Sequence, residues 1–143
     1  MILMVEDEQW RNDSYIAELR YAGYEVLDER DVDVAWRQFI EQREQIEAVI
    51  LDIMMAPGKR YMADTNAQGG LRTGLLLYRD MRAIAPALPV IFLTNVRFDL
   101  IADELKRARD VLVLRKLDYL PHTLPEQLRS LLKPDNAVSE MDA

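Results

Sequence analysis

Acidic, hydroxyl and ammonium side chains stand directly after short apolar runs in this sequence. Glu6 and Asp7 follow one such run, and Asp52 follows a second. Thr94 ends a third run, and Lys116 comes shortly after a fourth. Carboxylates gathered in one place repel one another, and a divalent cation between them relieves that repulsion. With a hydroxyl and an ammonium beside them, such carboxylates can bind a phosphoryl group and stabilise its transfer.

The metal-binding groups in this set are all oxygen atoms, which favours Mg²⁺ (or Mn²⁺) over zinc. The chain has no cysteine and a single histidine, His122, which excludes thiol catalysis and sites built from several histidines. Asp7 and Asp52 are the predicted ligands, together with the main-chain carbonyl of Met54, just past Asp52. Asp52 is then the natural nucleophile, and its attack on a phosphoryl group would form an acyl phosphate.

Short apolar runs alternate with helical spacing along the chain. The runs predict strands over residues 2–5, 24–27, 48–51, 89–93 and 111–114. Apolar residues three and four positions apart predict helices over residues 12–22, 32–40, 75–84, 101–108 and 124–132. Alternation of this kind predicts a parallel sheet with helices on both faces, whose carboxyl edge carries the site.

Local signals mark where two helices begin and end. Gly23 follows the first helical pattern, at the position where a left-handed residue is needed. Either Asp31 or Asp33 can cap the second helix. A long loop, about residues 53–73, separates the third strand from its helix and contains several glycines.

Charge and length limit the classes of function. The chain has 143 residues, which suits one domain over residues 1–133, followed by a polar, flexible tail over residues 134–143. Its 18 basic and 25 acidic residues give a net charge of -7, which argues against binding nucleic acid or an anionic membrane. No signal peptide or membrane-spanning apolar run is visible, so a cytoplasmic protein is expected.

The sequence resembles a response-regulator receiver domain of two-component signalling, in the CheY-like superfamily. The resemblance covers roughly residues 1–132 and rests on four stretches in the family's order. They are Ile-Leu-Met-Val-Glu-Asp-Glu at 2–8, Val-Ile-Leu-Asp-Ile-Met-Met at 49–55, Pro-Val-Ile-Phe-Leu-Thr at 89–94, and Lys116. It implies a doubly wound, flavodoxin-like sheet with strand order 2-1-3-4-5. It also implies Asp52 as phosphoacceptor, Glu6 and Asp7 as cation-binding acids, Thr94 as switch hydroxyl and Lys116 as the phosphate-pairing lysine.

The sequence departs from that family at four places. The loop over residues 53–73 is about a dozen residues longer than usual, and loops of that length are commonly functional. Val113 stands where receivers usually carry a tyrosine or phenylalanine. Leu117 follows Lys116 where proline is usual, and Asn95 is larger than the residue that usually follows the hydroxyl.

The resemblance implies a single-domain response regulator. Such a protein accepts a phosphoryl group from a sensor histidine kinase or a phosphotransfer protein, and contacts a downstream protein target, with a homodimer as an option. It is not an enzyme beyond self-catalysed phosphotransfer and slow autodephosphorylation. The alternative is a degenerate receiver that acts as a phosphorylation-independent adaptor. A hydrolase with an aspartyl nucleophile is disfavoured, because Met54 occupies the place of its second aspartate. A dinucleotide-binding enzyme is weaker still, because no glycine-rich turn follows the first strand.

Overall fold

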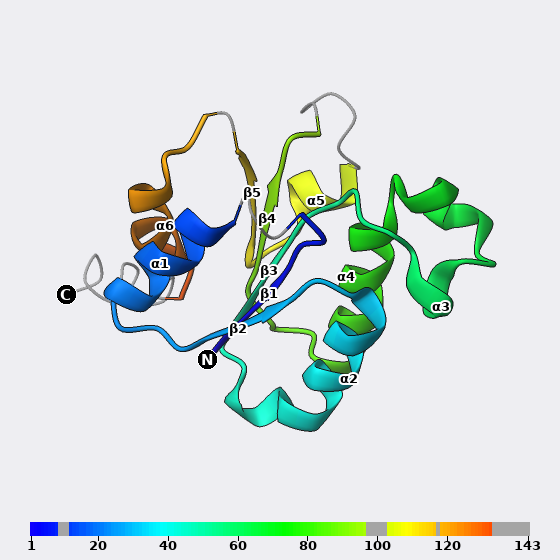
Figure 1. Cartoon of the computed structure of the whole chain (residues 1–143), viewed down its shortest axis with the longest axis horizontal. Helices are drawn as coiled ribbons and strands as arrows, with labels where there is room; N and C mark the ends of the chain where they lie inside the picture. Colours follow the sequence, from blue (N-terminus) through cyan, green and yellow to red (C-terminus); the bar gives the residue numbers. More distant parts are fainter. Residues whose placement is uncertain (9–11, 97–102, 117, 133–143) are drawn as a thin grey trace.

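A five-stranded parallel sheet forms the centre of the molecule (Figure 1). The computed structural model describes residues 1–8, 12–96, 103–116 and 118–132. The strand order is β2-β1-β3-β4-β5, as predicted for a doubly wound, flavodoxin-like fold. The strands are β1 (Ile2–Val5), β2 (Val26–Glu29), β3 (Ala48–Leu51), β4 (Val90–Thr94) and β5 (Val111–Arg115). The predicted tail over residues 134–143 lies outside the described residues.

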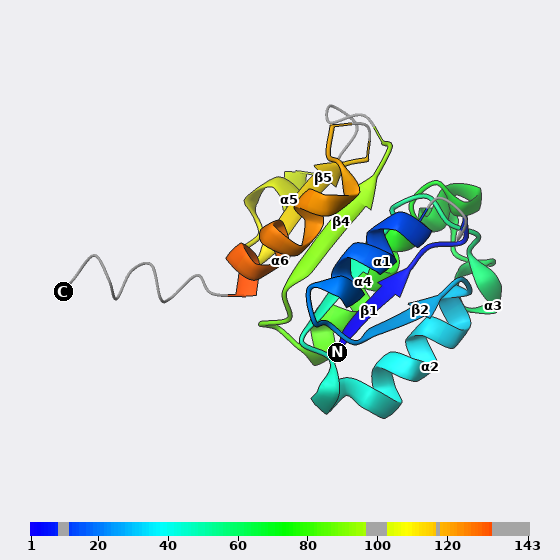
Figure 2. The ribbon, with the colours of Figure 1, turned by 60° about the vertical axis from the view of Figure 1, so that its left-hand side comes forward.

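Helices cover both faces of the sheet, as predicted (Figures 1 and 2). On one face, α1 (Asp13–Tyr21) and α6 (Leu124–Leu132) lie side by side and bury an apolar cluster that includes Leu19 and Leu128. The other face carries α2 (Val32–Gln42), α4 (Thr73–Ile84) and α5 (Asp103–Arg107), which lie over a cluster that includes Phe39 and Leu77. Burial on both faces explains why the central strands are apolar without alternation.

The edge strand and the helix ends follow local signals. β2 begins two residues later than predicted, and all its residues are only partly buried, as an edge position allows. Gly23 ends α1 with a φ of 99°, in the left-handed region that favours glycine. Of the two candidate caps of α2, Asp31 is the one that acts, because its carboxylate accepts from the amides of Asp33 and Val34. None of the described helices is long and apolar enough to cross a membrane.

The long segment after β3 is folded, although its sequence predicted a loop. It contains a short helix, α3 (Gly58–Tyr61), and a pair of 3-10 turns, η3 (Thr65–Gly70). Asp33 caps α3 instead of α2, because its two carboxylate oxygens accept from the amides of Lys59 and Arg60 at 2.7 and 2.9 Å.

Side chains also hold this segment against α2 and α4. The guanidinium of Arg60 lies 4.0 Å above the ring of Trp36 and 2.9 Å from a carboxylate oxygen of Asp80. The hydroxyl of Tyr61 donates to the same oxygen of Asp80 at 2.5 Å. The segment is therefore part of the packed domain, on the face that carries α2 and α4.

We expect Asp33→Ala to loosen α3. The variant removes the acceptor of two amides in the first turn of α3, a loss of about 1 kcal/mol for a capping residue. Trypsin should then cleave faster after Lys59 and Arg60. Asp31→Ala is the matched control, since it uncaps α2 and leaves α3 capped. Equal cleavage rates in the two variants would contradict the role given to Asp33.

Candidate functional site

Five of the predicted site residues, Met54 among them, line one hollow at the carboxyl edge of the sheet. Glu6 follows β1, Asp52 follows β3, Thr94 ends β4 and Lys116 follows β5. The hollow has a volume of about 210 Å³. The parallel register of the strands brings these residues together although Glu6 and Lys116 are 110 positions apart in the chain.

Asp52 lies between a hydroxyl and an ammonium. Thr94 Oγ1 donates to Asp52 Oδ1 at 2.7 Å, and Lys116 Nζ lies 3.2 Å from Asp52 Oδ2. The amide of Ile53 also donates to Oδ1, at 2.7 Å. The Asp52 side chain is 12% exposed, so the carboxylate is oriented by its donors yet reaches the hollow. The same hydroxyl and ammonium are suited to bind the oxygens of a phosphoryl group attached to Asp52.

Glu6 is the buried partner of Lys116. Its Oε2 lies 2.5 Å from Lys116 Nζ, its Oε1 accepts from the amide of Glu8, and its side chain is 3% exposed. Burial and the neighbouring Asp52 carboxylate raise the pKa of Glu6 to about 8, against the opposing effect of Lys116. Burial alone would lower the pKa of Lys116, but the Asp52 and Glu6 carboxylates raise it. Two carboxylates thus face one ammonium, an arrangement that favours a further cation.

The raised pKa of Glu6 predicts a pH dependence of stability in the metal-free protein. The folded state keeps the Glu6 proton up to a pH of about 8, whereas the unfolded carboxyl titrates near 4.5. This contribution to the free energy of unfolding is therefore complete below pH 4.5 and is lost as the pH rises towards 8.

Glu6→Gln should flatten the stability profile over that pH range, because glutamine does not titrate. Urea unfolding measured in steps of pH checks this. Glu41→Gln, on the exposed end of α2, is the control and should leave the slope unchanged. An unchanged slope in Glu6→Gln would show that another group causes the dependence.

Asp7 lies beside this group and not within it. Its Oδ2 accepts from the amide of Ala56 at 3.0 Å, and it lines a neighbouring hollow of about 260 Å³. Met54 borders both hollows. Within the described ranges, no three acidic or histidine side chains form a ready-made metal site. The cation site predicted from Glu6, Asp7, Asp52 and the Met54 carbonyl therefore stays a prediction.

Two residues at the start of α4 fix the backbone around Asp52, and the sequence pattern did not identify them. The amide of Gly74 donates to the carbonyl of Ile53 at 2.8 Å, and a Cβ on Gly74 would lie 1.8 Å from the carbonyl oxygen of Asp52. Thr73 is fully buried, and its hydroxyl donates to the carbonyl of Met55 at 2.7 Å. The only signal in the sequence for their role is that a threonine and a glycine stand directly before the helical pattern over residues 75–84.

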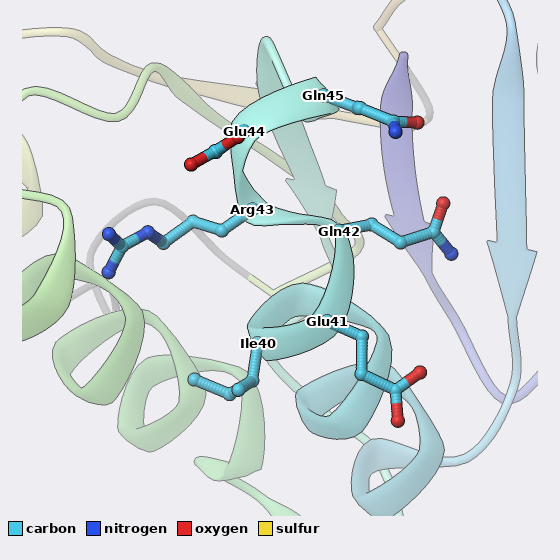
Figure 3. Close-up of a pocket in the computed structure, with 6 residues that line it drawn as sticks. All are labelled: Ile40, Glu41, Gln42, Arg43, Glu44 and Gln45. Carbon is cyan, nitrogen blue, oxygen red and sulfur yellow. The ribbon is translucent and has the colours of Figure 1, made fainter.

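A further hollow lies at the opposite end of the sheet, before β3 begins, and lacks the converging side chains of the carboxyl-edge hollow. It is lined by the consecutive residues 40–45, at the end of α2 and in η2 (Arg43–Gln45). Figure 3 shows that their side chains point to two opposite sides of the turn instead of converging. The carboxyl-edge hollow is therefore the better candidate site.

Known structures resemble this chain over nearly its whole length. No protein-family model matches the sequence, and no curated protein matches it either. The receiver domain from the hybrid histidine kinase CckA is 26% identical, with a TM-score of 0.66, and the match covers 92% of this chain and 98% of that one. A CheY-like receiver domain protein from Methanospirillum hungatei is 19% identical, with a TM-score of 0.71 over 95% of both chains.

A third similar structure is a CheX-CheY-BeF3-Mg²⁺ complex from Borrelia burgdorferi. It is 16% identical, with a TM-score of 0.67, over 91% of this chain and 87% of that one. The strand order, the helices on both faces and these similar structures agree. The chain therefore has the CheY-like receiver-domain fold of response regulators.

Proposed function

We propose that this chain accepts a phosphoryl group on Asp52 from a sensor histidine kinase or a phosphotransfer protein, in the cytoplasm. The observation that carries the proposal is the placement of Asp52, whose carboxylate reaches a hollow while Thr94 and Lys116 bind its two oxygens. The fold alone would not suffice, because one fold can support many functions.

The transfer would be a single displacement at phosphorus. A carboxylate oxygen of Asp52 forms a bond to phosphorus while the phosphorus–nitrogen bond of the phosphohistidine breaks, and the leaving imidazole keeps the electron pair and takes up a proton. The hydroxyl of Thr94 and the ammonium of Lys116 would stabilise the negative charge on the phosphoryl oxygens. Glu6 supports this by pairing with Lys116, which keeps the ammonium charged and in place.

Mg²⁺, or Mn²⁺, is the proposed cofactor. The donor set fits such an ion, because two carboxyl groups, Glu6 and Asp52, face the one ammonium of Lys116, so that a cation can take the place of the proton that Glu6 otherwise holds, and all donors are oxygen. Glu6, Asp7 and Asp52, with the Met54 carbonyl, would hold the ion. When bound, it would neutralise charge on the phosphoryl oxygens. The CheX-CheY complex with BeF3 and Mg²⁺ supports this choice by analogy.

The output would be a contact with a downstream protein target, and the only chemistry after uptake would be slow autodephosphorylation. A phosphorylation-independent adaptor is the second candidate, and the residue at position 113 in β5 favours it. Val113 occupies the place of the usual aromatic, lies half-buried and pairs with Phe92 in the sheet. Unchanged affinity for the partner after phosphorylation would favour the adaptor.

The proposal is tested by incubating the protein with Mg²⁺ and acetyl phosphate and measuring its intact mass. The expected result is a gain of one phosphate that chelation of Mg²⁺ prevents. Asp52→Asn should gain none, because the amide is not a nucleophile for phosphorus. The control is Asp80→Asn, which alters a carboxylate in the Arg60–Tyr61 cluster and should be phosphorylated normally. Equal uptake by wild type and Asp52→Asn would contradict the proposal.

A further inference from the structure

A side chain of α1 forms hydrogen bonds with the backbone at and after Lys116. The hydroxyl oxygen of Tyr15 lies 3.0 Å from the carbonyl oxygen of Tyr119 and 3.3 Å from that of Lys116. One hydroxyl proton serves two carbonyls at these distances, with the stronger bond to Tyr119. A single tyrosine of α1 therefore restrains both ends of the turn between β5 and η5 (Pro121–Thr123).

The backbone of Lys116 is fixed from two directions. Its amide donates to the carbonyl of Thr94 at 2.9 Å, which extends the bonding between β4 and β5. Its carbonyl faces the hydroxyl of Tyr15, and its ammonium reaches Glu6 and Asp52. A lysine side chain is a flexible stem, so the ammonium is placed reproducibly only if the backbone that carries it is fixed.

Packing does not explain why position 15 carries a hydroxyl. Tyr15 is 5% exposed, and its ring lies in the apolar cluster between the sheet and α1 and α6, with Leu114 and Leu124. Phenylalanine would fill the same space without a buried hydroxyl that must find acceptors. Both hydrogen bonds of the hydroxyl go to the turn after β5.

We propose that Tyr15 is a positioning residue for Lys116, because its hydroxyl holds the turn that carries the lysine and so keeps the ammonium against Asp52. This inference rests on the proposed function, since the place of the ammonium matters most for the transfer of a phosphoryl group to Asp52. Tyr15 itself touches neither Asp52 nor the site of transfer in these contacts.

Tyr15→Phe tests the inference, because it removes the hydroxyl and keeps the ring. We expect the rate of phosphate uptake from acetyl phosphate at saturating Mg²⁺ to fall about tenfold, as for a small misplacement of a catalytic group. Mg²⁺ affinity should not change. Tyr61→Phe is the matched control, because it also removes a buried hydroxyl, bonded to Asp80 away from this turn. It should be phosphorylated at the wild-type rate.

Two readouts separate positioning from a general loss of stability. In a Lys116→Ala background, Tyr15→Phe should lower the rate no further, because the two residues act as a unit. The ammonium of Lys116 should give a slowly exchanging proton–nitrogen NMR signal without any phosphate present, because Glu6 and Asp52 bind it. That signal should broaden in Tyr15→Phe and persist in Tyr61→Phe.

A wild-type rate and an unchanged ammonium signal in Tyr15→Phe would overturn the inference. Equal effects of Tyr15→Phe and Tyr61→Phe would also overturn it, since they would point to stability alone. If the wild-type protein took up no phosphate, the proposed function would fail, and the ammonium signal alone would decide for or against the positioning role.

Discussion

Gly74→Ala is expected to lower the free energy of unfolding by roughly 3 kcal/mol or more, as for the severe cases of overpacking. A Cβ at this position would lie 1.8 Å from the carbonyl oxygen of Asp52 and 2.8 Å from the Cα of Ile53. Both are backbone atoms at the end of a buried strand, so no side chain can turn away to make room. The helix α4 would have to move and lose the bond from the Gly74 amide to the Ile53 carbonyl.

The same variant should impair phosphate uptake, because relieving the clash displaces the backbone of Asp52. Gly69→Ala is the matched control. Gly69 has a φ of 66°, but a Cβ there would meet nothing within 4 Å. Its cost should be only the strain of a left-handed alanine, about 1 kcal/mol. Urea unfolding of both variants checks the comparison, and equal losses would contradict the close approach of α4 to Asp52.

Lys116→Met is expected to destabilise the metal-free protein by about 3 kcal/mol at pH 8, the cost of leaving a buried charge without its partner. The Lys116 side chain is 9% exposed, and those of Glu6 and Asp52 are 3% and 12% exposed. Water therefore screens the two ion pairs of Lys116 poorly. Methionine keeps an apolar stem and removes only the ammonium. The loss should shrink at low pH, where Glu6 takes up a proton and one of the two charges disappears.

Mg²⁺ should restore most of that stability, because the ion supplies the positive charge that the variant lacks. Its affinity should rise in Lys116→Met, while the rate of phosphate uptake falls. Thermal unfolding with and without Mg²⁺ at two pH values measures the first effect. Lys106→Met, on α5, is the control for removing a lysine from the surface. A loss that is the same at both pH values and insensitive to Mg²⁺ would contradict the account of this charge cluster.

The apolar pattern predicted β1, β3, β4 and β5 to within one residue at each end, because strands buried on both faces consist of continuous apolar runs. β2 was misplaced by two residues, since an edge strand carries a weaker pattern. The rule that sites lie at the carboxyl ends of parallel strands predicted that Glu6, Asp52, Thr94 and Lys116 lie together, as they do. The same rule included Asp7, which lies beside this group instead of within it.

Features that depend on distant contacts could not be predicted in this way. Nothing in the local sequence shows that Gly74 must approach the Asp52 carbonyl, or that Tyr15 bonds to a turn 101 and 104 positions later. The carboxylate of Asp7 bonds to Ala56 because of the course of the long segment after β3, which no periodicity describes. The helix α3 is too short to show a helical period in the sequence, and its cap, Asp33, comes from another helix. Its place could therefore not be predicted either.

The central claim is that Asp52 itself carries the phosphoryl group, and chemical trapping tests it most directly. After incubation with Mg²⁺ and acetyl phosphate, borohydride reduces an aspartyl phosphate to homoserine, and peptide mass mapping then locates the reduced residue. We predict that homoserine appears at position 52, and only when both Mg²⁺ and acetyl phosphate are present. Asp7 and Asp80 should remain aspartate. Phosphate uptake with aspartate intact at position 52, or with homoserine at another position, would contradict the account.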